Sequence, residues 1–318
     1  MTNSIPTGGT TGGAGRHAAA LARVLPAIGG MDTVQRLAGL SGSDFTSVML
    51  EVARRRAARE TPPSVLRRYE RDRFVRPGRM AGAIRRAEDV LLDDLPGDVE
   101  VVLLAPLVPL GAHSALGPVS QHKVVSTVRA CEVAADPTNA LALEAASRRA
   151  RARERLAPIR LAAVQRVVRA QRFAAGMFPH FSLFGLVTAG RDTGSLEFER
   201  SALAGQLEIA IRGVTAVTAR EVQIALTPLT DRGERIAAAV SADLGHVVID
   251  RGREAGRGYY RDLCFKVNAY ADGEPQEVGD GGFTDWTARL TANQKERLLI
   301  LGLGTERLAA LAPPGQGR

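Results

Sequence analysis

The end of the chain carries an apolar run that meets glycines and then a helical pattern. Residues 298–303 have the length and composition of a buried strand, and Gly304 precedes a helical pattern over 306–311. Arg307 follows this glycine turn directly. Glycine lets the backbone approach a ligand closely, and a guanidinium makes forked hydrogen bonds to phosphates or carboxylates. The segment predicts either an anion site or a glycine that packs a helix on a sheet, with Arg307 on the surface.

Strand patterns dominate the rest of the second half of the chain. The expected strands are 164–171, 181–189, 222–226, 246–249, 259–269, 275–279 and 297–303. The first two form a hairpin-like pair, and Asp272-Gly273 is a hairpin turn signal. Because most of these strands lie beside their sequence neighbours, we expect an α+β fold with a mainly antiparallel sheet flanked by helices.

The middle of the chain mixes helices and strands. A long amphipathic helix is expected at 80–95, followed by a strand over 99–106 that ends at a proline. Another strand is expected over 123–133. Asp136 and Pro137 then have the composition of a helix start, with the carboxylate as N-cap of a helix that continues to residue 153.

The N-terminal part divides into a tail and a helical region. Residues 1–16 are rich in Gly, Thr, Ser and Asn, so we expect a disordered tail. Residues 17–79 are expected to be helical, with one helix capped by Ser43 or Asp44 and ended by Pro62-Pro63. Residues 80–318 form the third expected unit.

Composition limits the classes of partner. The formal charge is 42 − 34 = +8, which favours an anionic partner such as a nucleotide or RNA. The basic residues are nearly all arginine and are interpreted as spread along the chain, which is also what a genomic bias would produce. Cys131 and Cys264 lie in no metal or disulfide pattern, so no metal site is expected. Without a signal peptide or a membrane-length apolar run, we expect a cytoplasmic protein.

The order of these pieces resembles the three motifs of class II aminoacyl-tRNA synthetase catalytic domains. Within that class it is most similar to histidyl-tRNA synthetase and to the regulatory subunit of ATP phosphoribosyltransferase. The resemblance covers roughly residues 80–311. The first motif falls on the helix at 80–95 and the strand to 106, which in the family form the dimer interface. The resemblance therefore implies a homodimer.

The second and third motifs of the family bind ATP, usually with Mg²⁺. The arginine that binds the α-phosphate falls on Arg169, and the phenylalanine that stacks on adenine falls on Phe181. The glutamate of the family is replaced by Gln171, which can still accept a hydrogen bond from an adenine amino group. The arginine of the third motif falls on Arg307. Taken alone, Phe181 is equally typical of a core residue.

Two further segments resemble the amino-acid pocket of the histidyl branch. Tyr259-Tyr260 matches its double tyrosine, and Gly281-Gly282 begins a match to its Gly-Gly-Arg-Tyr-Asp turn. Asp136 and Thr138 fall where the branch has Glu-Gly-Thr. Since neighbouring residues of a strand face opposite ways, only one tyrosine is expected to line a pocket, and we favour Tyr260.

The sequence also departs from the branch. Leu183 and Val187 occupy the places of polar residues that hold the substrate amino group. Ala255 occupies the place of the catalytic arginine, and Arg257, two residues on, would share its face in a strand and could act in its stead. Nothing after residue 311 matches an anticodon-binding domain, so tRNA is not the expected acceptor.

The first hypothesis is therefore a stand-alone ligase that activates a small carboxylic acid or amino acid with ATP. It would pass the acyl group to an amine, a carrier protein or a metabolite. The alternative is a non-catalytic regulatory or ligand-binding subunit, which the loss of the arginine at 255 favours. A third hypothesis is an RNA-binding module built on the basic helix around Arg54–Arg56 and Arg59, which requires a clustered basic patch.

Overall fold

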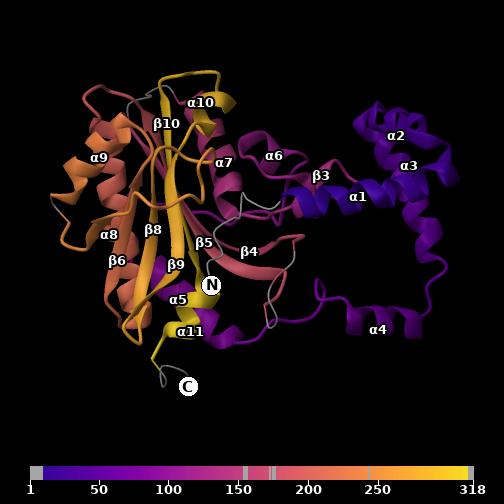
Figure 1. The fold of residues 1–318 in the computed structure, drawn as a ribbon, viewed down its shortest axis with the longest axis horizontal. Coiled ribbons are helices and arrows are strands. Elements are labelled where there is room, and N and C mark those ends of the chain that lie inside the picture. Colours follow the sequence, from indigo (N-terminus) through magenta and orange to yellow (C-terminus); the bar gives the residue numbers. More distant parts are fainter. Residues whose placement is uncertain (1–9, 153–156, 172, 174–176, 243, 314–318) are drawn as a thin grey trace.

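The body of the protein is one large sheet with helices on both faces (Figure 1). The computed structural model describes residues 10–152, 157–171, 173, 177–242 and 244–313. In spatial order the strands are β1 (Glu100–Val101), β4 (Ile159–Val168), β5 (His180–Arg191), β10 (Glu296–Gly304), β9 (Glu274–Thr284), β8 (Arg261–Ala271), β6 (Val222–Pro228) and β7 (Val247–Ile249). The two outer pairs, β1–β4 and β6–β7, are parallel, and the other neighbours are antiparallel. The predicted α+β fold with a mainly antiparallel sheet is confirmed.

One face of the sheet packs against four helices. These are α5 (Ala81–Asp93), α8 (Glu197–Thr218), α9 (Asp231–Ser241) and α11 (Thr305–Leu311). Helix α5 confirms the amphipathic pattern, because Ile84, Ala87 and Leu91 are buried against this core. Burial of each large aliphatic or aromatic side chain contributes roughly 1.5–3 kcal/mol. This apolar layer fixes the sheet so that its other face can hold polar groups.

The opposite face is only partly covered. Helix α7 (Pro137–Arg151) packs across β4 and β5, and α6 (Ala112–Leu116) and α10 (Trp286–Leu290) lie near its end (Figure 1). The smaller core on this side includes Leu141, Leu161, Val187, Leu298 and Ile300. Helix α7 begins where the sequence predicts, with Asp136 as its N-cap. Beyond this core, the same face carries the polar residues described below.

Two expected strands before α7 are largely absent. The strand predicted over 99–106 is reduced to β1, and the one predicted over 123–133 to β3 (Cys131–Val133), which pairs with β2 (Leu107–Pro109). A 3-10 turn spans Gln121–Lys123, and Ala130 has a left-handed backbone with φ 53°. This conformation turns the chain and interrupts an extended strand, whatever the apolar alternation around it.

The N-terminal helices extend away from the sheet (Figure 1). They are α1 (Thr10–Val24), the 3-10 helix η1 (Leu25–Ile28), α2 (Gly30–Ala38), α3 (Gly42–Ala57) and α4 (Pro62–Arg71). These helices and the segment that follows them to residue 79 are together called the helical arm. Residues 1–9 of the expected tail lie outside the described residues, whereas 10–16 are helical rather than irregular. The N-cap of α3 is Ser41, not Ser43 or Asp44. Pro62 begins α4, because proline fits the first helical turn and Thr61 caps it.

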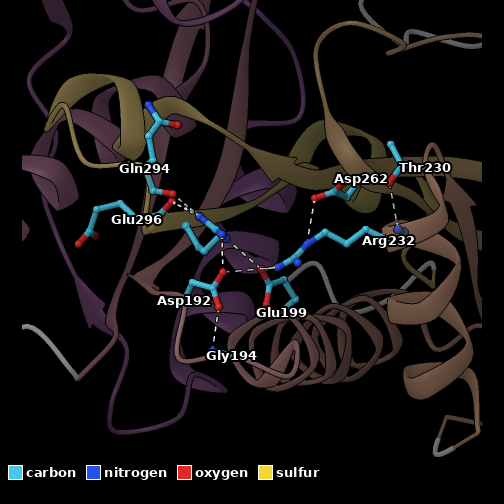
Figure 2. A network of polar contacts seen from close by, with 10 residues as sticks. Asp192, Gly194, Glu199, Thr230, Arg232, Asp262, Gln294 and Glu296 are labelled. Carbon is cyan, nitrogen blue, oxygen red and sulfur yellow. Dashed lines mark hydrogen bonds and ion pairs between the residues drawn. The ribbon is translucent and has the colours of Figure 1, made fainter.

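A network of ion pairs joins several element ends on the α8 side of the sheet (Figure 2). Glu199, in the first turn of α8, accepts hydrogen bonds from Arg232 of α9 at 2.5 Å and from Arg297 of β10 at 3.1 Å. Arg297 also donates to Asp192, which follows β5, and Arg232 lies 3.5 Å from Asp262. The Glu199 side chain is 2% exposed, so these partners compensate its desolvation. The network fastens the far ends of β5, β8 and β10 together.

Candidate functional site

Arg169, just past the end of β4, is the centre of a cluster on the partly covered face. Its Nε donates to the carbonyl of Ala135 at 2.9 Å, and Nη2 donates to Oδ2 of Asp136 at 3.2 Å. The guanidinium lies over the ring of Phe181, 5.1 Å from the ring centroid. Three predicted site residues, Arg169, Phe181 and Asp136, are therefore brought together. The arginine and the aromatic ring form a cationic surface beside a flat one.

Asp136 has two roles in this cluster. Oδ1 accepts hydrogen bonds from the backbone N–H of Thr138 at 2.9 Å and from its hydroxyl at 2.7 Å, and Oδ2 faces Arg169. Thr138 is buried and its hydroxyl is used by the cap. Of these two predicted substrate residues, Asp136 has a side chain that is 20% exposed, whereas Thr138 orients Asp136.

A buried pair behind this cluster, which sequence reasoning missed, holds it in place. His113 Nδ1 donates to Oε1 of Glu132 at 2.6 Å, and His113 Nε2 accepts from the backbone N–H of Ala135 at 3.0 Å. Burial raises the pKa of Glu132, but hydrogen bonds from the backbone N–H groups of His113 and Gly111, with the imidazole, outweigh it and lower the pKa. The imidazole, held by the Glu132 carboxylate, thus fixes Ala135, whose carbonyl binds Arg169.

The two tyrosines do not face opposite ways, which corrects the expectation drawn from a strand. They precede β8 in a turn in which Gly256 and Gly258 have φ of 89° and 84°. Their rings meet edge to face with centroids 4.9 Å apart. The hydroxyl of Tyr260 donates to Oδ2 of Asp280 at 3.2 Å, and burial raises the pKa of both phenols. Both aromatic rings therefore belong to the wall of the site.

Arg253, rather than Arg257, is the buried arginine before the tyrosines. Its side chain is 2% exposed, and Nη2 lies 3.1 Å from Oδ2 of Asp280, while Nη1 is buried without a hydrogen-bond partner among the described residues. Arg257 is exposed and donates to the carbonyl of Arg253. The strand argument for Arg257 does not hold, because this segment is not a strand and residues two apart do not share a face. A role for Arg257 in the site stays a prediction.

Asp280 was also missed, although it directly precedes the glycine pair at Gly281 and Gly282. Burial raises the pKa of Asp280; Arg253 opposes this effect, and the carboxylates of Glu277 and Asp136 add to it. Asp280 and Asp136 are therefore close enough to repel one another. The position of an acidic residue next to the matched turn was the signal in the sequence that could have found it.

Arg307 lies at the first turn of α11, as the sequence predicts. Its Nη1 donates to the carbonyl of Glu277 at 2.7 Å. Burial lowers the pKa of Arg307, Glu277 and Asp280 oppose that effect, and the charge of Arg169 lowers it further. Arg307 also lines a groove of about 630 Å³ on the same sheet face, with Lys266 of β8 among its walls. Arg169 and Arg307 thus flank one surface from two directions.

Glycines form the surface between these groups. Gly302 of β10 pairs with Gly185 of β5, and a Cβ added to Gly302 would meet only the carbonyl of Asp280, at 3.9 Å. A Cβ on Gly281 would lie 2.3 Å from the carbonyl of Ile300, and one on Gly282 2.6 Å from the ring of Tyr260. Gly302 leaves open space over the sheet, and Gly282 permits close packing of Tyr260 in the wall of the site. Gly281 faces the opposite side of the sheet, where a Cβ would meet Phe265 of the core beneath α8.

The remaining predicted residues occupy the edges of the site. Val187 is fully buried and Leu183 is half-buried, so this face of β5 offers apolar contacts. Gln171 is half-buried after the end of β4, next to residue 172, which lies outside the described residues. Among the described residues, no group of three or more His, Cys, Asp or Glu side chains could hold a metal ion. None of the described helices is long and apolar enough to cross a membrane.

No protein-family model and no curated protein sequence match the chain. A solved structure titled as an ATP phosphoribosyltransferase regulatory subunit/histidyl-tRNA synthetase from Bacillus halodurans matches with a TM-score of 0.57 and 13% identity, covering 73% of this chain and 80% of that one.

Two further structures agree. Apo histidyl-tRNA synthetase of S. aureus has a TM-score of 0.54 and 14% identity, and covers 72% of this chain and 68% of its own. A histidine–tRNA ligase subunit from Alicyclobacillus acidocaldarius has a TM-score of 0.54 and 16% identity, and the match covers 76% of this chain and 96% of that one. At these identities the similarity establishes the fold. The chain therefore has the class II synthetase-like fold that its sequence motifs predict.

Proposed function

We propose that this chain is a stand-alone class II synthetase-like ligase that activates a carboxylate with ATP and transfers the acyl group to an acceptor other than tRNA. The observation that carries the proposal is the arrangement of Arg169 over Phe181, with Arg307 on the other side of the open surface at Gly302. A flat ring suits a nucleobase, and two guanidiniums suit a polyphosphate. A sensor of a small ligand needs no such pair of arginines.

In the proposed reaction, a carboxylate oxygen of the acid attacks the α-phosphorus of ATP. The bond from that phosphorus to the bridging oxygen breaks, and pyrophosphate leaves with the electron pair. Arg169 would bind the α-phosphate and oppose the negative charge that grows there, while Arg307 would bind the departing phosphates. Phe181 and Gln171 would hold the adenine. An amine, a carrier protein or a metabolite would then attack the acyl carbon of the adenylate, and AMP would leave with the electrons of the broken carbon–oxygen bond.

Magnesium fits this site only when it is bound together with the phosphates of the nucleotide. The nearby carboxylates are already paired, Asp280 with Arg253 at 3.1 Å and Glu277 with Lys266 at 3.1 Å. Mg²⁺ commonly uses one or two carboxylates together with substrate phosphates and water. It would supply charge neutralisation on the phosphates, with Glu277 and Asp280 as the nearest carboxylates, each of which would share its charge with its present partner.

The acid substrate would occupy the space bounded by Asp136, Tyr260 and Asp280. The apolar side chains of Leu183 and Val187 cannot bind an ammonium group, and both oxygens of Asp136 already have partners. We therefore expect an acid other than histidine. A homodimer formed through the β1 edge is part of the same proposal, because Leu103 is 99% exposed there and Val101 50% exposed.

The test is ATP–pyrophosphate exchange with the full chain and Mg²⁺, across amino acids and other small carboxylic acids, with histidine included. Exchange that depends on one acid supports the ligase and identifies its substrate. If no acid supports exchange and calorimetry detects no ATP binding, the proposal is overturned. That outcome would favour the alternative, a non-catalytic regulatory subunit. The alanine at position 255, in the place of the catalytic arginine, supports this alternative.

A further inference from the structure

The helical arm lacks a core of its own. None of the residues of α2, α3 and α4 is buried. Of the 21 exposed large hydrophobic side chains among the described residues, 12 lie between residues 24 and 75. Helices of this length are marginal in water unless an apolar face is packed. The arm therefore has the composition of a surface that another polypeptide covers.

Three of these exposed side chains, Val65, Leu66 and Tyr69, line a groove between the end of α3 and α4. The groove has a volume of about 730 Å³, and its apolar walls are Ala57, Pro62, Val65, Leu66 and Tyr69. Val65 is 54% exposed and Leu66 57% exposed. A tyrosine among aliphatic side chains is typical of the energetic centre of a protein interface.

A basic groove of about 650 Å³ adjoins the first, because Glu60 lines both. Its walls include Arg67, Arg68, Arg71 and Arg73. Arg68 pairs with Glu60 at 2.7 Å. The other three arginine side chains have no ion-pair partner within the described part of the chain. Their charges are available to an acidic partner.

The charge of the chain is concentrated in the arm, which corrects the expectation of an even spread. Residues 10–79 hold 13 arginines, no lysine and 6 acidic residues, so their net charge is 13 − 6 = +7. Residues 80–318 hold 29 basic and 28 acidic residues, which gives 29 − 28 = +1. A second copy would bring either another arm of +7 or a nearly neutral body. Neither complements the basic groove.

The aliphatic groove also argues against nucleic acid as the partner. Protein–nucleic acid interfaces are polar and strongly charged, and a phosphate backbone would leave Val65 and Leu66 uncovered. The helix predicted as an RNA-binding surface uses two of its arginines internally, because Arg54 and Arg55 both pair with Glu51 at 2.7 Å. A partner that supplies carboxylates and aliphatic side chains together satisfies both grooves.

We propose that the helical arm binds an acidic amphipathic helix of another protein. Its aliphatic side chains would enter the groove at Val65 and Leu66, and its carboxylates would face Arg67, Arg71 and Arg73. This is the recognition mode in which an apolar helix face lies in a groove while flanking charges fix its direction. The inference rests on the arm alone and does not depend on the ligase activity.

The end of the arm contacts β5, the strand that carries Phe181. Arg73 is three residues from Arg76, so their Cα atoms are at most about 10 Å apart. The carbonyl of Arg76 accepts a hydrogen bond from His180 Nε2 at 2.5 Å, and His180 precedes Phe181 in β5. A protein docked on the basic groove therefore lies close to the strand that carries the aromatic ring of the site.

The test uses the full chain and a fluorescein-labelled synthetic peptide of about three heptads, with leucine at the a and d positions and glutamate at most others. We expect polarisation to report saturable binding that weakens with added salt. Leu66→Asp and the double variant Arg67→Glu/Arg71→Glu should each weaken binding by at least about tenfold. The double variant Arg129→Glu/Arg200→Glu, on exposed arginines of the body, has the same charge change and should bind as the wild type does.

Three results would overturn the inference. The first is that the acidic peptide does not bind, or that it binds no more tightly than a control peptide in which every glutamate is replaced by glutamine. The second is tight binding of a single-stranded RNA of about 20 nucleotides. If the Arg67→Glu/Arg71→Glu variant loses this binding and Leu66→Asp keeps it, the arm is a nucleic-acid surface. The third is self-association in sedimentation that Leu66→Asp abolishes, which identifies a second copy as the occupant.

Discussion

Arg253 Nη2 lies 3.1 Å from Oδ2 of Asp280, and the arginine side chain is almost completely enclosed. A buried guanidinium costs desolvation free energy that its partner offsets. Asp280 also accepts the hydroxyl hydrogen bond of Tyr260. The pair therefore joins the turn before β8 to β9, in the part of the sheet that borders the proposed substrate.

The first prediction concerns this pair. Asp280→Ala leaves Arg253 buried without its carboxylate and should lower the free energy of unfolding by about 1–3 kcal/mol. Asp280→Asn retains an acceptor oxygen and should cost less. Urea unfolding of the three proteins measures the difference. Arg257→Gln, at an exposed neighbour, is the control and should change stability by no more than about 0.5 kcal/mol.

The second prediction separates nucleotide binding from folding. Arg169→Ala should weaken ATP binding by at least about tenfold, because a charge-assisted contact to phosphate is lost. Arg169→Lys should not restore it fully, since lysine lacks the planar fork that also lies over Phe181. Calorimetry with MgATP provides the affinity. Arg160→Ala, at the opposite end of β4 and paired with Asp98, should bind ATP normally; equal affinity for all variants would refute the assignment.

The third prediction compares two glycines on neighbouring strands. The methyl group of Gly302→Ala would project into open space, so the variant should fold with stability within about 0.5 kcal/mol of the wild type and bind ATP at least about tenfold more weakly. The methyl group of Gly281→Ala would collide with Phe265 and the carbonyl of Ile300, and should cost about 1–3 kcal/mol of stability. Thermal unfolding and calorimetry together distinguish these cases. Normal ATP binding by Gly302→Ala would remove the glycine surface from the site.

The fourth prediction concerns acid stability. Folding lowers the pKa of Glu132 from its ordinary value of 4.5. The carboxylate therefore stabilises the folded protein above about pH 4.5, and this stabilisation is lost as the pH falls through the lower folded pKa. Glu132→Gln should lower stability near neutral pH and make the unfolding free energy less steep below about pH 5. Urea unfolding across this pH range tests the slope. An unchanged slope would mean that the carboxylate is not ionised in the folded state.

The fifth prediction concerns association through the β1 edge. Leu103→Asp adds a charge to a fully exposed aliphatic position and should shift a dimer to monomer in analytical ultracentrifugation. Leu290→Asp changes a 40% exposed leucine elsewhere and should leave the mass unchanged. A monomeric wild-type protein would contradict the homodimer proposal directly.

Much of the sheet could be predicted because its strands lie beside their sequence neighbours. The hairpin of β4 and β5 was expected from two apolar runs, and its register brings Arg169 to the same end as Phe181. Helix α7 followed from the cap at Asp136. Such signals are local, and local hydrogen bonds and alternation are readable in a single sequence.

The parts that were mispredicted depend on backbone turns and on distant partners. The tyrosine pair was misplaced because Gly256 and Gly258 adopt left-handed conformations that no alternation pattern reveals. The burial of Arg253 has no local signal in the sequence, since its partner Asp280 lies 27 residues away. Helix α9 was missed although Thr230 is an ordinary N-cap signal. Pairing across the sheet decides which charged residues become buried.

The edge-to-face contact between Tyr259 and Trp286, with centroids 5.5 Å apart, gives the chain an intrinsic optical reporter. Trp286 is the single tryptophan of the sequence, and it is 1% exposed beside the tyrosine that borders Asp136 and Asp280. Its emission therefore arises from one place, next to the proposed acid pocket. A ligand that moves the tyrosine rings will change that emission without any added label, so unlabelled acids can be screened by titration in a fluorimeter.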